Sequence, residues 1–186
     1  MSISDKEYNK ISDTVYWIDI KHKDYNPDIT EGSVQKIAGQ SYKVLKLKDS
    51  KENGMQAMAV APLDKNGKVD TSQVVIAYAG TNVGDDLDVL TDVQTVGLNK
   101  DTLTTSTRVE VPFNPNKPSD RYVTTTTTVD AQSVTALQFA NEISKLYPNS
   151  RITTTGHSLG EYLALLVAAE NQWVNVGFNG PDPYGV

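Results

Sequence analysis

The chain has 186 residues, 38% of them hydrophobic, which suits the core of one ordinary domain. The formal net charge is −6, and the basic clusters that a nucleic-acid-binding protein needs are absent from the sequence. The chain has no cysteine, which excludes disulfides, thiolate catalysis and zinc–thiolate sites.

The N-terminal ten residues contain neither a basic segment nor an apolar segment, so we expect no cleaved secretory signal. The longest apolar run, Leu163 to Ala169, is too short to span a bilayer. We therefore expect a soluble, cytoplasmic chain without a transmembrane segment, and export that needs no cleaved signal stays open.

The first predicted elements are a helix and a pair of strands. Ser4 and Glu7 have the spacing of a capping box, which predicts a helix that runs toward Asp13. Residues 42–48 alternate apolar and basic side chains, as in a half-exposed strand. Residues 56–61 are expected to form its antiparallel neighbour.

The middle of the chain contains a turn, a buried strand and a threonine-rich excursion. The Asn-Gly pair within residues 64–67 predicts a turn. The continuous apolar run 74–78 is typical of a strand that is buried on both faces. Residues 97–129 are rich in threonine and interrupted by three prolines, and we interpret them as a plain surface hairpin in preference to a substrate lid. They do not indicate a second domain.

The last part of the chain alternates helices and strands. Apolar residues recur at helical spacing in 130–147, which predicts a helix. A strand (151–155), a helix (159–171) and a strand (173–178) follow, in the order of a parallel crossover. The sequence therefore predicts the α/β class, with residues 1–186 in a single domain.

The strand-to-helix junction carries a Gly-x-Ser-x-Gly pattern centred on Ser158. In that context the turn projects the serine hydroxyl out of the sheet as a nucleophile. Gly156 and Gly160 leave room for the tight turn, and the N–H of Leu159 points where an oxyanion would form. His157 is interpreted as a packing residue.

Together with the elbow, two further stretches resemble the class 3 lipases, notably bacterial lipase domains. They are Tyr78-Ala79-Gly80-Thr81, followed by Asp88-Val89-Leu90-Thr91-Asp92, and Phe178-Asn179-Gly180-Pro181. The resemblance implies an α/β-hydrolase-like fold, a mostly parallel sheet with flanking helices, and a lipid or other acyl-ester substrate. It gives Thr81 the role of second oxyanion donor. Ala79 and Val89 replace the family's usual arginine and tryptophan.

Within residues 1–186, no histidine stands where a catalytic triad would have its base. In α/β-hydrolases the acid and then the histidine follow the nucleophile, yet none of the 28 residues after Ser158 is histidine. Asp182 is a candidate acid, although the family places its acid after one further strand. His22 lies in a polar segment and is interpreted as solvated surface. We therefore expect a C-terminally incomplete domain with little or no esterase activity.

Two other functions stay open. The segment from Gly156 to Leu165 also resembles the elbow of malonyl/acyl-carrier-protein transacylases, in particular through Glu161. Alternatively, the chain is a non-catalytic fragment whose open sheet edge pairs with a partner or with itself.

We expect no cofactor. The sequence has no metal-binding motif and no phosphate-binding glycine loop. The acidic cluster of Asp85, Asp86, Asp88 and Asp92 is interpreted as helix-start charge together with aspartates of the class 3 lipase motif, in preference to a cation site.

Overall fold

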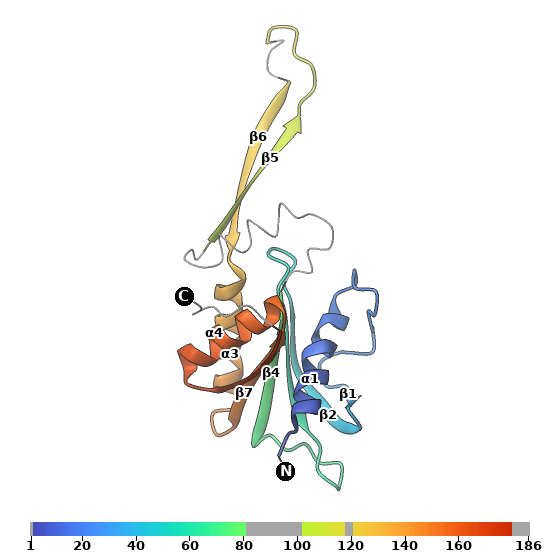
Figure 1. The fold of residues 1–186 in the computed structure, drawn as a ribbon. Coiled ribbons are helices and arrows are strands. Elements are labelled where there is room, and N and C mark those ends of the chain that lie inside the picture. Colours follow the sequence, from blue (N-terminus) through green and yellow to red (C-terminus); the bar gives the residue numbers. More distant parts are fainter. Residues whose placement is uncertain (1, 81–101, 118–120, 180–186) are drawn as a thin grey trace.

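The computed structural model describes residues 2–80, 102–117 and 121–179. A six-stranded sheet in the order β1-β2-β3-β4-β7-β8 forms the body, and a two-stranded ribbon, β5-β6, extends from it (Figure 1). The helices are α1 (Asp5–Thr14), α3 (Gln132–Leu146) and α4 (Leu159–Asn171), with a short 3-10 helix η1 (Val15–Ile18). The strands are β1 (Val34–Ile37), β2 (Gln40–Asp49), β3 (Gln56–Pro62), β4 (Gln73–Ala79), β5 (Thr102–Glu110), β6 (Tyr122–Asp130), β7 (Arg151–His157) and β8 (Val174–Phe178).

The main sheet is mixed. Strands β1 to β4 pair antiparallel in chain order, whereas β4, β7 and β8 pair parallel. The α/β class predicted from the sequence is confirmed, but antiparallel pairs outnumber parallel ones among the described strands, where a mostly parallel sheet was expected. The reason lies in the connections: β1 to β4 are joined by segments of ten residues or fewer, and only the later strands are separated by the long connections that parallel pairing requires.

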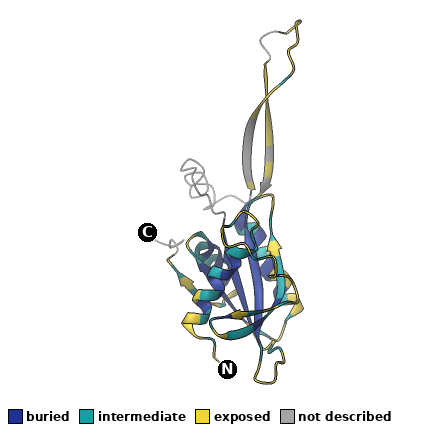
Figure 2. Cartoon of the chain, turned by 90° about the vertical axis from the view of Figure 1, so that its right-hand side faces the viewer, coloured by how far each residue is buried: buried dark blue, intermediate teal, exposed yellow. Residues whose placement is uncertain are grey.

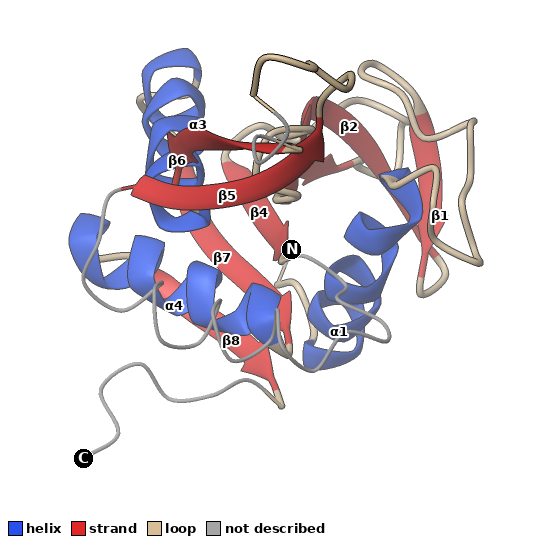
Figure 3. Ribbon diagram, turned by 90° about the horizontal axis from the view of Figure 1, so that it is seen from above, coloured by secondary structure: helices blue, strands red, loops and turns tan. Residues whose placement is uncertain are grey.

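Helices cover both faces of this sheet. Seen from above, α3 and α4 lie on one side of it and α1 on the other (Figure 3). Strand β4 runs through the middle, and alternate side chains belong to two separate apolar clusters. Val74, Ile76 and Tyr78 pack toward α3 and α4, while Val75, Ala77 and Ala79 pack toward α1; all six are fully buried. The prediction of a strand buried on both faces is therefore confirmed, and Figure 2 shows this buried centre in dark blue.

The N-terminal helix begins as predicted. Ser4 and Glu7 form the reciprocal capping box, in which the Glu7 N–H donates to Ser4 Oγ and the Ser4 N–H donates to Glu7 Oε2. Strand β1 and helix η1 were not predicted. Only Ile37 of the four residues in β1 is buried, so the strand leaves almost no hydrophobic pattern in the sequence.

The described part of the threonine-rich segment, residues 97–129, forms a hairpin, in agreement with the preferred interpretation. Strands β5 and β6 pair antiparallel without interruption from Thr102–Asp130 to Glu110–Tyr122. The ribbon projects away from the body (Figures 1 and 2). At its base, the side-chain amide of Asn53 donates to the Asp130 carbonyl at 3.0 Å, and the side-chain amide of Gln132 donates to the Asn53 carbonyl at 2.7 Å.

Candidate functional site

The candidate site lies at the edge of the sheet where β4 and β7 end. Tyr78 pairs with Gly156 in these parallel strands, so their carboxyl ends meet where α4 begins. Gly80, directly after β4, approaches Leu159 so closely that an added Cβ would lie 2.4 Å from the leucine Cγ. The end of β4 and the first residue of α4 are therefore in direct contact.

Ser158 occupies the turn between β7 and α4. Its φ is 55° and its ψ is −123°, outside the helix that follows, and its side chain is exposed. A positive φ is uncommon for a non-glycine residue and costs about 1–3 kcal/mol. The surrounding structure must therefore hold Ser158 in place, as the predicted nucleophile elbow requires.

Gly156 and Gly160 permit this turn by close packing. A Cβ on Gly156 would lie 2.2 Å from the carbonyl oxygen of Gly160, and a Cβ on Gly160 would lie 2.0 Å from the carbonyl oxygen of Tyr78. Both clashes are with backbone, which cannot rotate away. Glycine is thus required at both positions for steric reasons.

Two long-range hydrogen bonds fix the backbone on either side of this turn. The Ser158 N–H donates to the carbonyl of Phe178 at 3.0 Å, at the end of β8. The Tyr16 hydroxyl donates to the carbonyl of His157 at 2.7 Å. Burial raises the pKa of Tyr16 to about 12, so the hydroxyl keeps its proton for this bond at neutral pH.

A pocket of about 470 Å³ opens beside Ser158. Seven of its ten lining residues come from the N-terminal segment, four from α1 and η1 and three from the loop that follows η1. Its lining residues are Lys10, Asp13, Tyr16, Trp17, His22, Lys23, Asp24, His157, Ser158 and Leu159. Apolar rings and charges of both signs therefore surround the serine.

His22 lies in this pocket, half-buried, which differs from its interpretation as solvated surface. His22 and Ser158 are 136 positions apart in the sequence, and the fold brings them to the same pocket. The Nδ1 of His22 accepts the N–H of Asp24 at 3.1 Å, so in the neutral ring the proton resides on Nε2. In this tautomer neither ring nitrogen of His22 has a free lone pair, which a general base must offer.

Glu161, in the first turn of α4, packs against β8. Its Oε1 accepts from the side-chain amide of Asn175 at 2.9 Å, and its Oε2 is buried without a hydrogen-bond partner among the described residues. An added Cβ on Gly177 would lie 1.5 Å from Oε2. Burial raises the pKa of Glu161, although the Asn175 bond opposes the shift. Glu161 therefore has a packing role that does not depend on acyl transfer.

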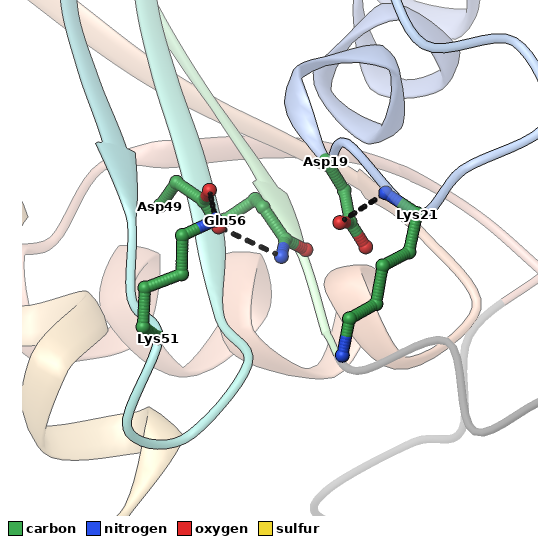
Figure 4. A network of polar contacts seen from close by, with 5 residues as sticks. All are labelled: Asp19, Lys21, Asp49, Lys51 and Gln56. Atoms are coloured by element: carbon green, nitrogen blue, oxygen red, sulfur yellow. Dashed lines mark hydrogen bonds and ion pairs between the residues drawn. The ribbon is translucent and has the colours of Figure 1, made fainter.

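A polar network borders the same end of the sheet, because Gln56 pairs with Ala79 at the end of β4. The Asp49 carboxylate forms an ion pair with Lys51 and accepts from the side-chain amide of Gln56 at 3.3 Å (Figure 4). The carboxylate of Asp19 accepts the N–H of Lys21 at 2.9 Å nearby (Figure 4). These contacts fix the β2–β3 turn and the loop after η1.

The remaining predicted site residues, Thr81 and Asp182, lie outside the described residues, as does the acidic cluster of residues 85–92. Their roles stay predictions. Within 2–80, 102–117 and 121–179, no three His, Asp or Glu side chains are grouped so that they could hold a metal ion. The helices of these ranges are all too short or too polar to cross a membrane.

Comparison with known proteins gives likenesses of fold only. No protein-family model and no curated protein matches the chain. The chain is similar to solved structures of fungal lipases: a lipase from Rhizopus microsporus var. chinensis (16% identity, 90% of this chain and 50% of that one, TM-score 0.42), the Lip2 lipase of Yarrowia lipolytica (14%, 91% and 54%, 0.47) and a Rhizomucor miehei lipase propeptide complex (19%, 88% and 44%, 0.39). The chain spans about half the length of these lipases. Its own strand order is that of a mixed α/β sheet, and Ser158 lies at the turn between β7 and α4.

Proposed function

We propose that this chain carries the nucleophile part of a serine-dependent acyl-ester hydrolase of the lipase or carboxylesterase type. The observation that carries the proposal is the backbone of Ser158, held at φ 55° between two glycines that have no room for a Cβ. A serine is placed in such a conformation when its hydroxyl must project from the sheet.

In the proposed reaction, Ser158 Oγ attacks the acyl carbonyl carbon and the carbonyl oxygen becomes an oxyanion. The N–H of Leu159, at the first turn of α4, donates to this oxygen, and Thr81 supplies the second donor. Asp182 is the candidate acid. The hydroxyl proton needs a base, and His22 is a poor one because its Nδ1 is already occupied by the Asp24 N–H.

We therefore propose that residues 1–186 alone hydrolyse esters very slowly. The test is labelling with a fluorophosphonate, read by intact mass, with Ser158→Ala as the control. Slow or no labelling of folded protein is expected. Rapid labelling that disappears in Ser158→Ala would show an activated serine, and His22→Gln would then show whether the base is His22.

Acyl transfer remains the second candidate, on the strength of the sequence around Glu161. Since the carboxylate of Glu161 contacts Asn175 and Gly177, its presence alone does not favour transfer over hydrolysis. Transfer of an acyl group to a carrier thiol without hydrolysis would support it. The non-catalytic alternative would be supported if the chain neither reacted with fluorophosphonate nor transferred an acyl group, yet formed a dimer. The Ser158→Ala variant should then dimerise to the same extent.

A further inference from the structure

The far end of the β5–β6 ribbon exposes several large apolar side chains. Phe113 is 67% exposed, and Val109, Tyr122 and Val123 are each about half exposed. They all lie within the turn end of one hairpin, distant in the fold from the sheet (Figures 1 and 2). Clustered apolar groups of this kind mark a contact surface, unlike single exposed residues.

These side chains are directed to both faces of the ribbon. Val109 and Val123 are cross-strand partners and therefore share one face. Tyr122 precedes Val123 and so belongs to the opposite face, and Phe113 lies beyond the end of β5. A flat protein surface would cover one face only, whereas a fluid lipid interface can surround both.

The charges around this end have the sign that anionic lipid attracts. Residues 108–124 contain three basic and two acidic side chains, which gives +1, while the rest of the chain carries −7. The guanidinium of Arg108 lies 4.2 Å from the centre of the Tyr122 ring. Aromatic rings beside basic groups are the combination that is stable at the level of lipid headgroups.

We propose that this apolar end, defined by Val109, Phe113, Tyr122 and Val123, inserts into the headgroup region of an anionic lipid bilayer. Nine-residue strands span roughly 30 Å. The base of the ribbon is bound to Asn53, in the turn at the same sheet edge as Ser158. The ribbon thus tethers that edge near the lipid surface without burying it, and tethering needs no hydrolysis.

The test uses the Ser158→Ala chain, so that hydrolysis and the proposed function do not affect the result. Co-sedimentation with vesicles of equal parts phosphatidylcholine and phosphatidylglycerol is expected to show binding. Phe113→Ser with Val123→Ser should lower the partition coefficient by about tenfold or more. The control, Leu146→Ser with Val174→Ser, removes two apolar side chains of the body that are each 52% exposed, and it should not change the partition coefficient.

A second pair of substitutions tests the contribution of the basic side chains. Lys117→Glu with Arg121→Glu should weaken binding to the mixed vesicles. Absence of binding by Ser158→Ala, or equal losses in the ribbon and body variants, would overturn the proposal. A dimer in the absence of lipid, measured by light scattering, would also overturn the proposal if Phe113→Ser with Val123→Ser made it monomeric. A second copy of the chain would then cover this end.

Discussion

The hydroxyl of Tyr16 donates a 2.7 Å hydrogen bond to the carbonyl of His157, the residue immediately before Ser158. The two residues are 141 positions apart in the sequence. This contact joins η1 to the turn that carries the candidate nucleophile, and it lies in the wall of the pocket beside Ser158. Tyr16 is therefore a positioning residue for that turn.

Tyr16→Phe should destabilise the chain by about 1 kcal/mol, the usual net value of one hydrogen bond. It should also slow any fluorophosphonate labelling of Ser158, because the elbow is held less firmly. Urea unfolding and labelling rates measure the two effects. Tyr25→Phe, at an exposed tyrosine, is the control, and equal losses in both variants would contradict the positioning role.

The hydrogen bond from Tyr16 to His157 should make the stability of the chain depend on pH in the alkaline range. The pKa of Tyr16 is raised from 10.0 to about 12 in the folded chain, so the folded state holds this proton more tightly than the unfolded state. The stability that results is complete below pH 10 and is lost as the pH rises toward about 12. The stability difference between wild type and Tyr16→Phe should shrink over this window in urea titrations. A constant difference would show that the hydroxyl proton is not retained.

Two glycine substitutions should differ sharply in cost. An added methyl on Gly160 meets the backbone of Tyr78, whereas one on Gly177 meets the end of the Glu161 side chain, which can rotate. Gly160→Ala should cost about 2–4 kcal/mol and Gly177→Ala about 1 kcal/mol. The denaturant midpoints of the two variants measure these losses of stability. Similar values would mean that β4 and α4 pack less tightly than the close approach of Gly160 to Tyr78 implies.

Glu161 should make stability depend on pH in the acidic range. Because burial raises its pKa above the ordinary 4.5, the folded state binds this proton more tightly than the unfolded state. Stability therefore falls as the pH rises through 4.5 and on through the raised value, then levels off. Glu161→Gln should remove this fall in urea unfolding followed from acidic to neutral pH. Glu170→Gln, on the exposed face of α4, should leave it intact.

Asn53 should hold the base of the ribbon. Its side-chain amide donates both to the Asp130 carbonyl and to Thr135 Oγ1, at 3.0 and 2.7 Å. Asn53→Ala should cost about 1–2 kcal/mol and increase hydrogen exchange at the start of α3. Asn66→Ala, in an exposed turn, is the comparison. Unchanged exchange at Thr135 in the Asn53 variant would contradict the role.

The sequence predicts those elements that are determined by residues close together in the chain. The capping box at Ser4, the bounds of α4 and the buried run in β4 are each set by neighbours along the chain. Strand β1 could not be found in this way, since it is a strand only through its pairing with β2. The balance of antiparallel and parallel pairs likewise depends on which strands become neighbours.

For the candidate site, the sequence by itself determined the serine, its flanking glycines and the strand and helix around them, because the elbow is a local motif of five residues. Only the tertiary structure decided what surrounds Ser158. Tyr16 and His22 reach it from the N-terminal segment, and Asn175 engages Glu161 from β8. Such contacts depend on how elements pack across long sequence separations, and no spacing pattern in the chain encodes them.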